Sequence, residues 1–168
     1  SPSLLVEAKK IADEHNLPYA VHFLESQAEL SQLQQRFAKR PTEYLRDIGY
    51  LTDRFLAYHC VCMDDEDMHL FAEHGCKVVH NPESNMKLSS GVAPVPSMLL
   101  SGITVGLGTD GCASNNNLDM FQEMDTAAKL HKVAGLDPMV MDARTVIRMA
   151  TSEGAKALRL GHIIGSLE

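Results

Sequence analysis

The chain alternates between segments with helical spacing of apolar residues and short continuous apolar runs. Residues 3–16 place apolar side chains three and four positions apart, which predicts an amphipathic helix, whereas the run at 19–24 is typical of a buried strand. Further strands are predicted at 54–61, 77–81 and 103–108, and further helices at 27–39, from Pro41 to just before Gly49, and at 64–74, 96–101, 118–134 and 142–150. Strands that alternate with helices indicate an α/β fold with a parallel sheet.

Polar stretches between these segments are predicted as loops. Residues 82–95 are expected to form a long irregular loop, and residues 112–117, CASNNN, a polar loop. The segment HNPESNMKLSSG at 80–91 has two open interpretations. Its Asn-Pro, Ser and Gly residues favour turns, and its many hydrogen-bonding groups favour a loop that faces a substrate.

Three glycines, Gly106, Gly108 and Gly111, spell the G-x-G-x-x-G pattern of dinucleotide-binding proteins. That pattern needs a helix that opens at the glycines and a second strand with an acidic end about 20 residues later. Here the glycines lead into the polar loop, and no such strand follows. A dinucleotide site is therefore not expected.

Composition narrows the classes of function. A chain of 168 residues with 45% hydrophobic and 22% charged residues is expected to form one globular domain. The formal net charge of −7 argues against a nucleic-acid partner, and the lack of a long apolar run argues against a membrane span. No secretion signal opens the chain, and the cysteines lack zinc-ribbon spacing. Free thiols and a cytoplasmic location are therefore expected for Cys60, Cys62, Cys76 and Cys112.

Polar residues stand near the carboxyl end of every predicted strand. They are His22 and Glu25, then His59, then His80 with Asn81, and finally Asp110. The carboxyl ends of parallel strands are where sites assemble in α/β folds, and buried charges need partners. Imidazole and carboxylate are natural ligands of zinc, iron or manganese, and a carboxylate that is not a ligand can transfer protons.

Several motifs in order then resemble one family. VHFLES (21–26), AYHC (57–60), VVHNPESNMKLSSGVAPV (78–95) and VGLGTDGCASNNNLDMFQEM (105–124) are similar to the later motifs of the amidohydrolase superfamily. The tail from residue 142 onward also resembles that family. The closest likeness is to the branch that holds 5-methylthioadenosine/S-adenosylhomocysteine deaminases and triazine hydrolases.

The resemblance implies the second half of a TIM-type (β/α)₈ barrel, with about four parallel strands and flanking helices. Residues 1–168 would be a single partial barrel domain. The first metal motif of the family, His-x-His, has no counterpart here, and neither has the G-K-x-A-D segment that follows the barrel in relatives. A half-barrel exposes strand edges, so a homo-oligomer that closes it is expected.

The resemblance also assigns roles to residues. His22 and Asp110 would bind one divalent metal, with zinc expected and iron or manganese as alternatives. Glu25, His59 and Asp110 would be catalytic: Glu25 as acid and base, His59 beside the attacking water, and Asp110 as acceptor of its proton. The substrate-binding residues would come from the loop after the third strand of this chain, namely Asn81, Ser84 and Asn85.

The implied reaction is metal-dependent hydrolysis of a C–N bond other than a peptide bond. Its expected form is deamination of an adenosine derivative, 5-methylthioadenosine or S-adenosylhomocysteine, by an enzyme of which this chain is a part. One alternative is an aminohydrolase or chlorohydrolase that acts on triazines, or a guanine-type enzyme that acts on another heterocyclic amine. The other alternative is a half-barrel that associates with itself and has no catalytic activity.

Overall fold

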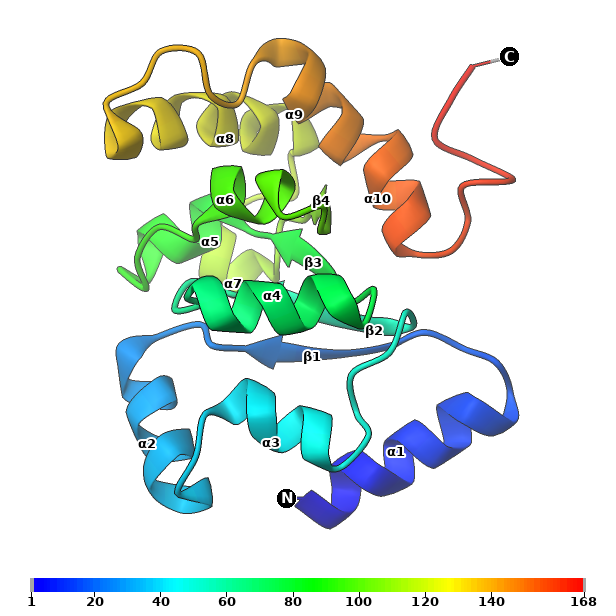
Figure 1. Ribbon diagram of the computed structural model, residues 1–168. Coiled ribbons are helices and arrows are strands. Elements are labelled where there is room, and N and C mark those ends of the chain that lie inside the picture. The colour runs from blue at the N-terminus through cyan, green and yellow to red at the C-terminus, as the bar shows by residue number, and fades with distance from the viewer. Residues whose placement is uncertain (1, 168) are drawn as a thin grey trace.

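The computed structural model describes residues 2–167 and contains one four-stranded sheet (Figure 1). The strands are β1 (Tyr19–Phe23), β2 (Phe55–His59), β3 (Lys77–His80) and β4 (Thr104–Leu107). All neighbouring strands are parallel and lie in the order of the chain. The predicted α/β fold with four parallel strands is confirmed. Because the strands are parallel, their carboxyl ends share one edge of the sheet.

Helices connect the strands, as predicted. They are α1 (Pro2–Glu14), α2 (Gln27–Phe37), α3 (Pro41–Asp47), α4 (Asp65–Glu73), α5 (Pro82–Lys87), α6 (Val95–Leu100), α7 (Cys112–Asn115), α8 (Met120–Gly135), α9 (Ala143–Ala150) and α10 (Ser152–Ala157). Side chains that accept backbone N–H bonds start α2, α4, α8 and α9, at Ser26, Asp64, Asp119 and Asp142. In Figure 1, α1 to α3 gather beside β1, and α8 and α9 lie at the opposite end of the sheet.

Two loop predictions are wrong. The segment 82–95 is not irregular throughout, because α5 occupies its first six residues. Pro82 stands at the first helical position, where its missing N–H and fixed φ are compatible with a helix. The polar stretch 112–117 likewise begins with the one-turn helix α7. Both errors arise because Asn, Ser and Pro occur in turns and in short helices alike, so composition does not separate the two.

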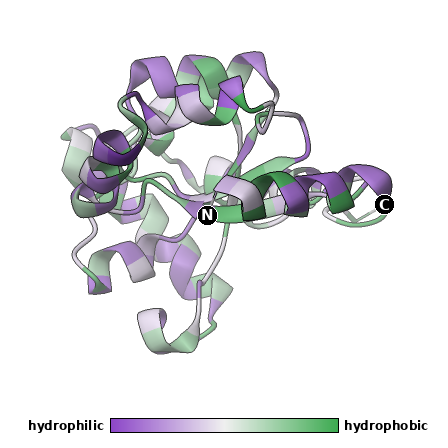
Figure 2. Ribbon diagram, turned by 90° about the horizontal axis from the view of Figure 1, so that it is seen from below, coloured by the Kyte–Doolittle hydropathy of each residue, from purple (hydrophilic) through white to green (hydrophobic). Residues whose placement is uncertain are grey.

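The two faces of the sheet have different partners. Phe23, Phe55, Val78 and Val105 belong to the main core, which the connecting helices cover. Alternate residues of the strands point to the other face, where Leu56 and Val79 pack with Ala157 of α10. Figure 2 shows helices banded with hydrophilic and hydrophobic residues, as expected for helices that cover a core. None of the helices between residues 2 and 167 has the length and apolar character to cross a membrane.

Two glycines of the G-x-G-x-x-G pattern, Gly106 and Gly108, have packing roles. A Cβ on Gly106 would lie 3.1 Å from the backbone of Gly154 in α10, and one on Gly108 would lie 2.9 Å from Asn81 Oδ1. Glycine therefore lets α10 approach β4 and lets the buried Asn81 side chain sit against the strand end.

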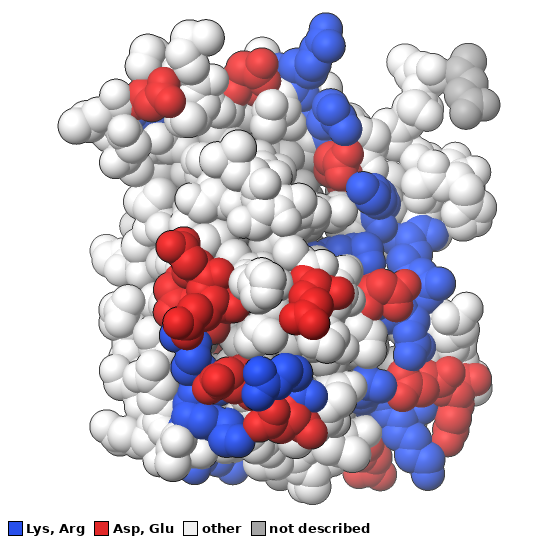
Figure 3. Space-filling view, in the orientation of Figure 1, with Lys and Arg blue, Asp and Glu red and all other residues white. Residues whose placement is uncertain are grey.

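Charged side chains of both signs are mixed on the surface that Figure 3 shows. Arg40, for example, pairs with Glu66 at 2.8 Å and with Asp67 at 3.2 Å. Asp67 is buried, whereas Glu66 is exposed, and an exposed ion pair such as that with Glu66 stabilises the fold little. Lys and Arg side chains gather along the right side of this view, where Asp and Glu side chains lie among them.

Candidate metal centre

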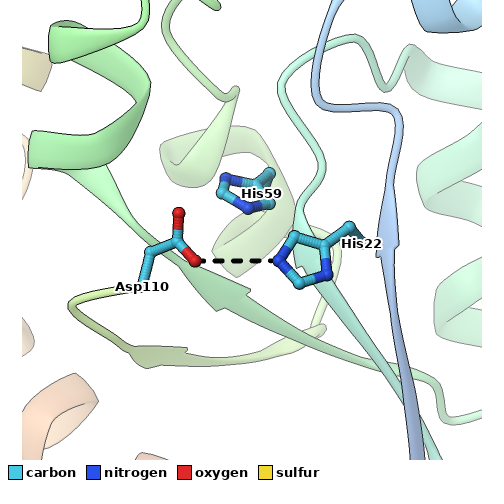
Figure 4. A group of neighbouring side chains, drawn as sticks. All are labelled: His22, His59 and Asp110. Carbon is cyan, nitrogen blue, oxygen red and sulfur yellow. Dashed lines mark ion pairs between the residues drawn. The ribbon is translucent and has the colours of Figure 1, made fainter. Parts of the chain in front are cut away.

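The carboxyl edge of the sheet brings together three side chains that are distant in the sequence. His22 belongs to β1, His59 ends β2, and Asp110 follows β4. One ligand atom from each lies within 4.8 Å of the other two. Within this group, His22 Nε2 and Asp110 Oδ1 lie 3.7 Å apart. Figure 4 shows the three side chains pointing toward one another.

The backbone turns sharply where these strands end. Leu24, His59 and Asp110 have φ values of +52°, +72° and +58°, in the left-handed region that favours glycine. Such conformations cost on the order of 1–3 kcal/mol each and persist only where the surroundings determine them. The turn at Leu24 ends β1 after Phe23. In a continuous strand His22 and Glu25 would point to opposite faces, so a turn between them is needed if both are to face one site.

Asp110 is held as a carboxylate. Its Oδ2 accepts hydrogen bonds from Ser84 Oγ at 2.7 Å and Ser114 Oγ at 2.5 Å. Burial acts to raise the pKa of Asp110, but the hydrogen bonds from Ser114, Ser84 and the Gly111 N–H outweigh it and lower the pKa to about 2. The side chain is therefore anionic at neutral pH, and Oδ1 faces His22.

His59 is fully buried, and Asn85 fixes its ring. His59 Nδ1 lies 2.8 Å from Asn85 Oδ1, which can only accept, so Nδ1 carries the proton. The lone pair is then on Nε2, which is buried and has no hydrogen-bond partner among residues 2–167. An imidazole oriented in this way by a second residue is typical of metal sites and of groups that bond to a reacting water.

These residues fit a divalent cation. Zinc bonds of about 2.0–2.1 Å in a tetrahedral site put neighbouring ligand atoms roughly 3.3 Å apart. The 3.7 Å between His22 and Asp110 needs only a small adjustment to reach that value. The orphaned Nε2 of His59 is the unsatisfied atom that such an ion, or a water next to it, would satisfy. The His22 side chain is 59% exposed, so one side of the group is open.

Known proteins of one family resemble this chain along its whole length. The sequence matches the Amidohydrolase family over residues 1–168. The chain belongs to the amidohydrolase family. It is 58% identical, over all 168 residues, to 5-methylthioadenosine/S-adenosylhomocysteine deaminase 1 of Syntrophus aciditrophicus. It is 47% identical over 151 residues, 90% of the chain, to 5'-deoxyadenosine deaminase of Methanopyrus kandleri. The chain spans 38% of the length of the first of these relatives and 35% of the second.

Solved amidohydrolase structures share the fold. An adenosine deaminase from Xanthomonas campestris with bound zinc superposes with a TM-score of 0.96 at 39% identity, over the whole chain and 38% of that structure. An atrazine chlorohydrolase from Arthrobacter aurescens TC1 complexed with zinc gives 0.93 at 28% identity, over the whole chain and 37% of that structure. The four strands and their helices are therefore part of an amidohydrolase (β/α)₈ barrel, whose sites lie at the carboxyl ends of the strands.

The other predicted site residues surround the three-residue group. Glu25 follows the end of β1, is half-buried and is not one of the three. Asn81, Ser84 and Asn85 are buried. Ser84 and Asn85 bond to Asp110 and His59, so the structure gives them supporting contacts. Their predicted contact with a substrate, and that of Asn81, stays a prediction.

Sequence reasoning missed one direct partner of the site. Ser114 lies on α7, four residues after Asp110, and donates to its carboxylate. Because residues 112–117 were expected to form an irregular loop, this contact was not predicted. A one-turn helix directly after the strand end is what brings residue i+4 back to Asp110.

His80 has a different partner from the other strand-end histidines. Its Nε2 lies 3.0 Å from His131 Nε2 of α8, and both rings are buried. Burial lowers the pKa of His131 to about 4 and that of His80 well below its usual range. The fold therefore holds both rings neutral and uses them to join α8 to the sheet.

This pair predicts acid sensitivity. His131 titrates near 6.5 when unfolded and near 4 when folded, so its stabilising contribution is complete above pH 6.5 and falls as pH drops toward 4. The loss approaches roughly 3 kcal/mol. We expect His131→Gln to flatten this dependence, measured by urea unfolding of metal-free protein between pH 7 and 4.5.

The matched control is His69→Gln on the exposed side of α4, which should leave the pH dependence unchanged. Glu123 has the opposite effect on the pH dependence of stability. Burial raises its pKa to about 7, so its contribution to the free energy of unfolding grows as the pH falls from 7 toward 4.5. Only the difference between variant and parent therefore isolates His131. An equal pH dependence in the parent and His131→Gln would contradict the prediction.

Proposed function

We propose that this chain supplies part of the catalytic barrel of a metal-dependent aminohydrolase that acts on adenosine derivatives. Water adds at the ring carbon that bears the amino group, the amine leaves as ammonia, and a ring carbonyl remains. The observation that carries the proposal is the convergence of His22, His59 and Asp110 at the carboxyl edge of the sheet. The relatives named deaminases of 5-methylthioadenosine, S-adenosylhomocysteine and 5'-deoxyadenosine support the substrate class.

His22 and Asp110 would hold the metal, and zinc is the proposed ion because two of the solved relatives contain it. Iron and manganese suit the same ligands and remain alternatives. Such an ion supplies Lewis acidity that lowers the pKa of water toward about 7. Catalytic zinc has three protein ligands, so further ligands would come from outside this chain.

The proposed proton transfers use residues of this chain. Asp110, ionised at neutral pH, accepts the proton of the attacking water. Glu25 delivers a proton to the ring nitrogen beside the reacting carbon. His59 would accept a hydrogen bond from the attacking water through its unprotonated Nε2 and so orient that water. The substrate itself would contact Asn81, Ser84 and Asn85, at the carboxyl end of β3.

A second candidate function has support from solved structures. An atrazine chlorohydrolase and a guanine deaminase with bound guanine, from C. acetobutylicum, superpose with TM-scores of 0.93 and 0.89. Atrazine and guanine are both electron-poor heterocycles, so the same scaffold would serve a triazine or guanine-type enzyme. Activity assays on a panel of 5-methylthioadenosine, S-adenosylhomocysteine, guanine and atrazine would distinguish the two proposed functions.

We propose that residues 1–168 act as one unit that requires the rest of a barrel. The edge strands of the sheet are β1 and β4. The face of the sheet that carries Tyr58, Val79 and Gly106 borders a cavity of about 740 Å³. Parallel sheets are normally covered on both faces and closed at their edges in this fold. Without a preceding half, a second copy would cover this face, as a homo-oligomer. The four free thiols fit a reducing compartment such as the cytoplasm.

Two preparations test the proposal: the chain alone, and the chain grafted in place of the matching residues of the Syntrophus aciditrophicus relative. Each is loaded with zinc and assayed for ammonia release on the panel, and its mass is measured by light scattering. We expect the graft to deaminate an adenosine derivative. An inactive graft that folds and binds zinc would contradict a catalytic role for this chain. An active, self-associated chain would support closure by a second copy.

Glu25→Gln tests the proposed acid in the active graft. The amide cannot give up a proton, so kcat should fall roughly 10²–10⁴-fold. Zinc content should stay at the parent level, because Glu25 is outside the ligand group.

The matched control is Glu29→Gln, which makes the same chemical change one helical turn later. The Glu29 carboxylate accepts from the Glu25 N–H at 2.7 Å, and an amide oxygen can accept the same bond. This control should therefore keep both the backbone at Glu25 and the parent kcat. Unchanged kcat in Glu25→Gln would rule out the proposed role.

A further inference from the structure

Glu123 is a fully buried carboxylate that the proposed reaction does not use. It lies near the start of α8 and shares the buried face of that helix with Ala127 and His131. The two other members of this face pack against the core or the sheet, as is usual for an amphipathic helix. A buried carboxylate is costly unless hydrogen bonds satisfy it, so its partners indicate its purpose.

The two oxygens of Glu123 bond to two different segments. Oε2 accepts from the backbone N–H of Glu83, in the first turn of α5, at 3.3 Å. Oε1 accepts from Nδ2 of Asn115, at the end of α7. The same Nδ2 donates to the carbonyl of Thr109 at 2.6 Å. One side chain on α8 therefore joins α5, α7 and the residue directly before Asp110.

Both segments carry the groups that orient the candidate metal centre. Ser84 and Asn85, which follow Glu83, bond to Asp110 and His59. Ser114, which precedes Asn115, bonds to Asp110 as well. Asp110 itself has a left-handed backbone that only its surroundings maintain. A second contact, from Thr126 Oγ1 to Glu83 at 2.9 Å, ties α5 to the same helix.

We propose that Glu123 is a positioning residue that sets the geometry of Asp110 and His59 from α8. It holds the α5 and α7 backbones in register, and through them the three hydrogen bonds that orient the carboxylate and the imidazole. The expected effect on kcat rests on the proposed function. The expected effect on zinc affinity depends only on the residues of the candidate metal centre.

The test compares Glu123→Gln with Asp125→Asn in the zinc-binding graft at a pH well above 7, where Glu123, whose pKa burial raises to about 7, is a carboxylate. The amide in Glu123→Gln would keep the shape of the side chain but present one oxygen where two donors need acceptors, so one segment loses its partner. Asp125 is an exposed carboxylate two residues later on α8 and is the matched control. Zinc affinity is measured by competition with a chelator in the absence of substrate, and kcat and KM are measured separately.

We expect Glu123→Gln to weaken zinc binding and to lower kcat, each by about 10–100-fold, with KM nearly unchanged. Asn115→Ala, which cuts the α7 branch alone, should act in the same direction and keeps the test open if Glu123→Gln fails to fold. Lower unfolding temperature with zinc affinity and kcat within twofold of the parent would overturn the proposal. A parent that binds zinc but deaminates nothing contradicts the proposed function, while the affinity comparison still decides the role of Glu123.

Discussion

Replacing Asp110 with asparagine is expected to abolish tight zinc binding and to lower kcat/KM by roughly 10³-fold or more. The amide has nearly the same shape, so it can keep a hydrogen bond from Ser84 or Ser114. It lacks the negative charge that those bonds maintain, and it is a much weaker proton acceptor. The variant therefore removes the metal ligand and the proposed base in one step. Zinc content per chain and kcat/KM of the graft are the two measurements.

Asp125→Asn is a matched control for this variant also, because it makes the same chemical change on an exposed helix face. It should leave zinc content and kcat/KM at the parent level. An Asp110→Asn protein that keeps one zinc per chain would show that the ligands lie elsewhere. Normal kcat/KM in such a protein would contradict both proposed roles of Asp110.

Much of the fold could be predicted because the hydrophobic pattern is strong where helices and strands are long. The apolar strand runs and the helical spacing of the longer helices agree with the structure. Each of these signals is local, so the sequence displays it directly. The strand order also follows from locality, since each helix returns the chain to the neighbouring position in the sheet.

The short helices α5 and α7 could not be predicted in the same way. Each is a single turn or slightly more, too short to show a period, and rich in residues that serve turns and helix starts alike. Each of them bonds to Glu123 of α8, α5 through Glu83 and α7 through Asn115. Those contacts span 40 and 8 positions, respectively, and no local pattern encodes them.

The candidate site shows the same division. Strand-end positions of His22, His59 and Asp110 pointed to one edge of the sheet, and the structure brings these three together. The supporting contacts of Ser84 and Asn85 are different, because they depend on the left-handed turns at His59 and Asp110, which redirect both side chains. Backbone conformations that non-glycine residues rarely adopt are set by tertiary contacts.

The second large effect is expected for His59→Asn, which should lower kcat roughly 10²–10³-fold. Asparagine tolerates the left-handed backbone at this position better than most residues, so the turn after β2 should persist. Its side chain is too short to place an acceptor where Nε2 of the imidazole lies. If His22 and Asp110 are the metal ligands, zinc affinity should fall much less than kcat.

Asn85→Leu separates the orientation of His59 from its presence. It removes the acceptor of the Nδ1 proton at nearly constant volume and leaves that N–H buried without a partner. We expect kcat to fall about 10–100-fold, because the ring loses the contact that fixes its tautomer. In the double variant His59→Asn/Asn85→Leu, the second change should cost nothing further, since there is no imidazole left to orient. Additive losses would mean that Asn85 acts on the substrate itself, the role predicted for it from the sequence.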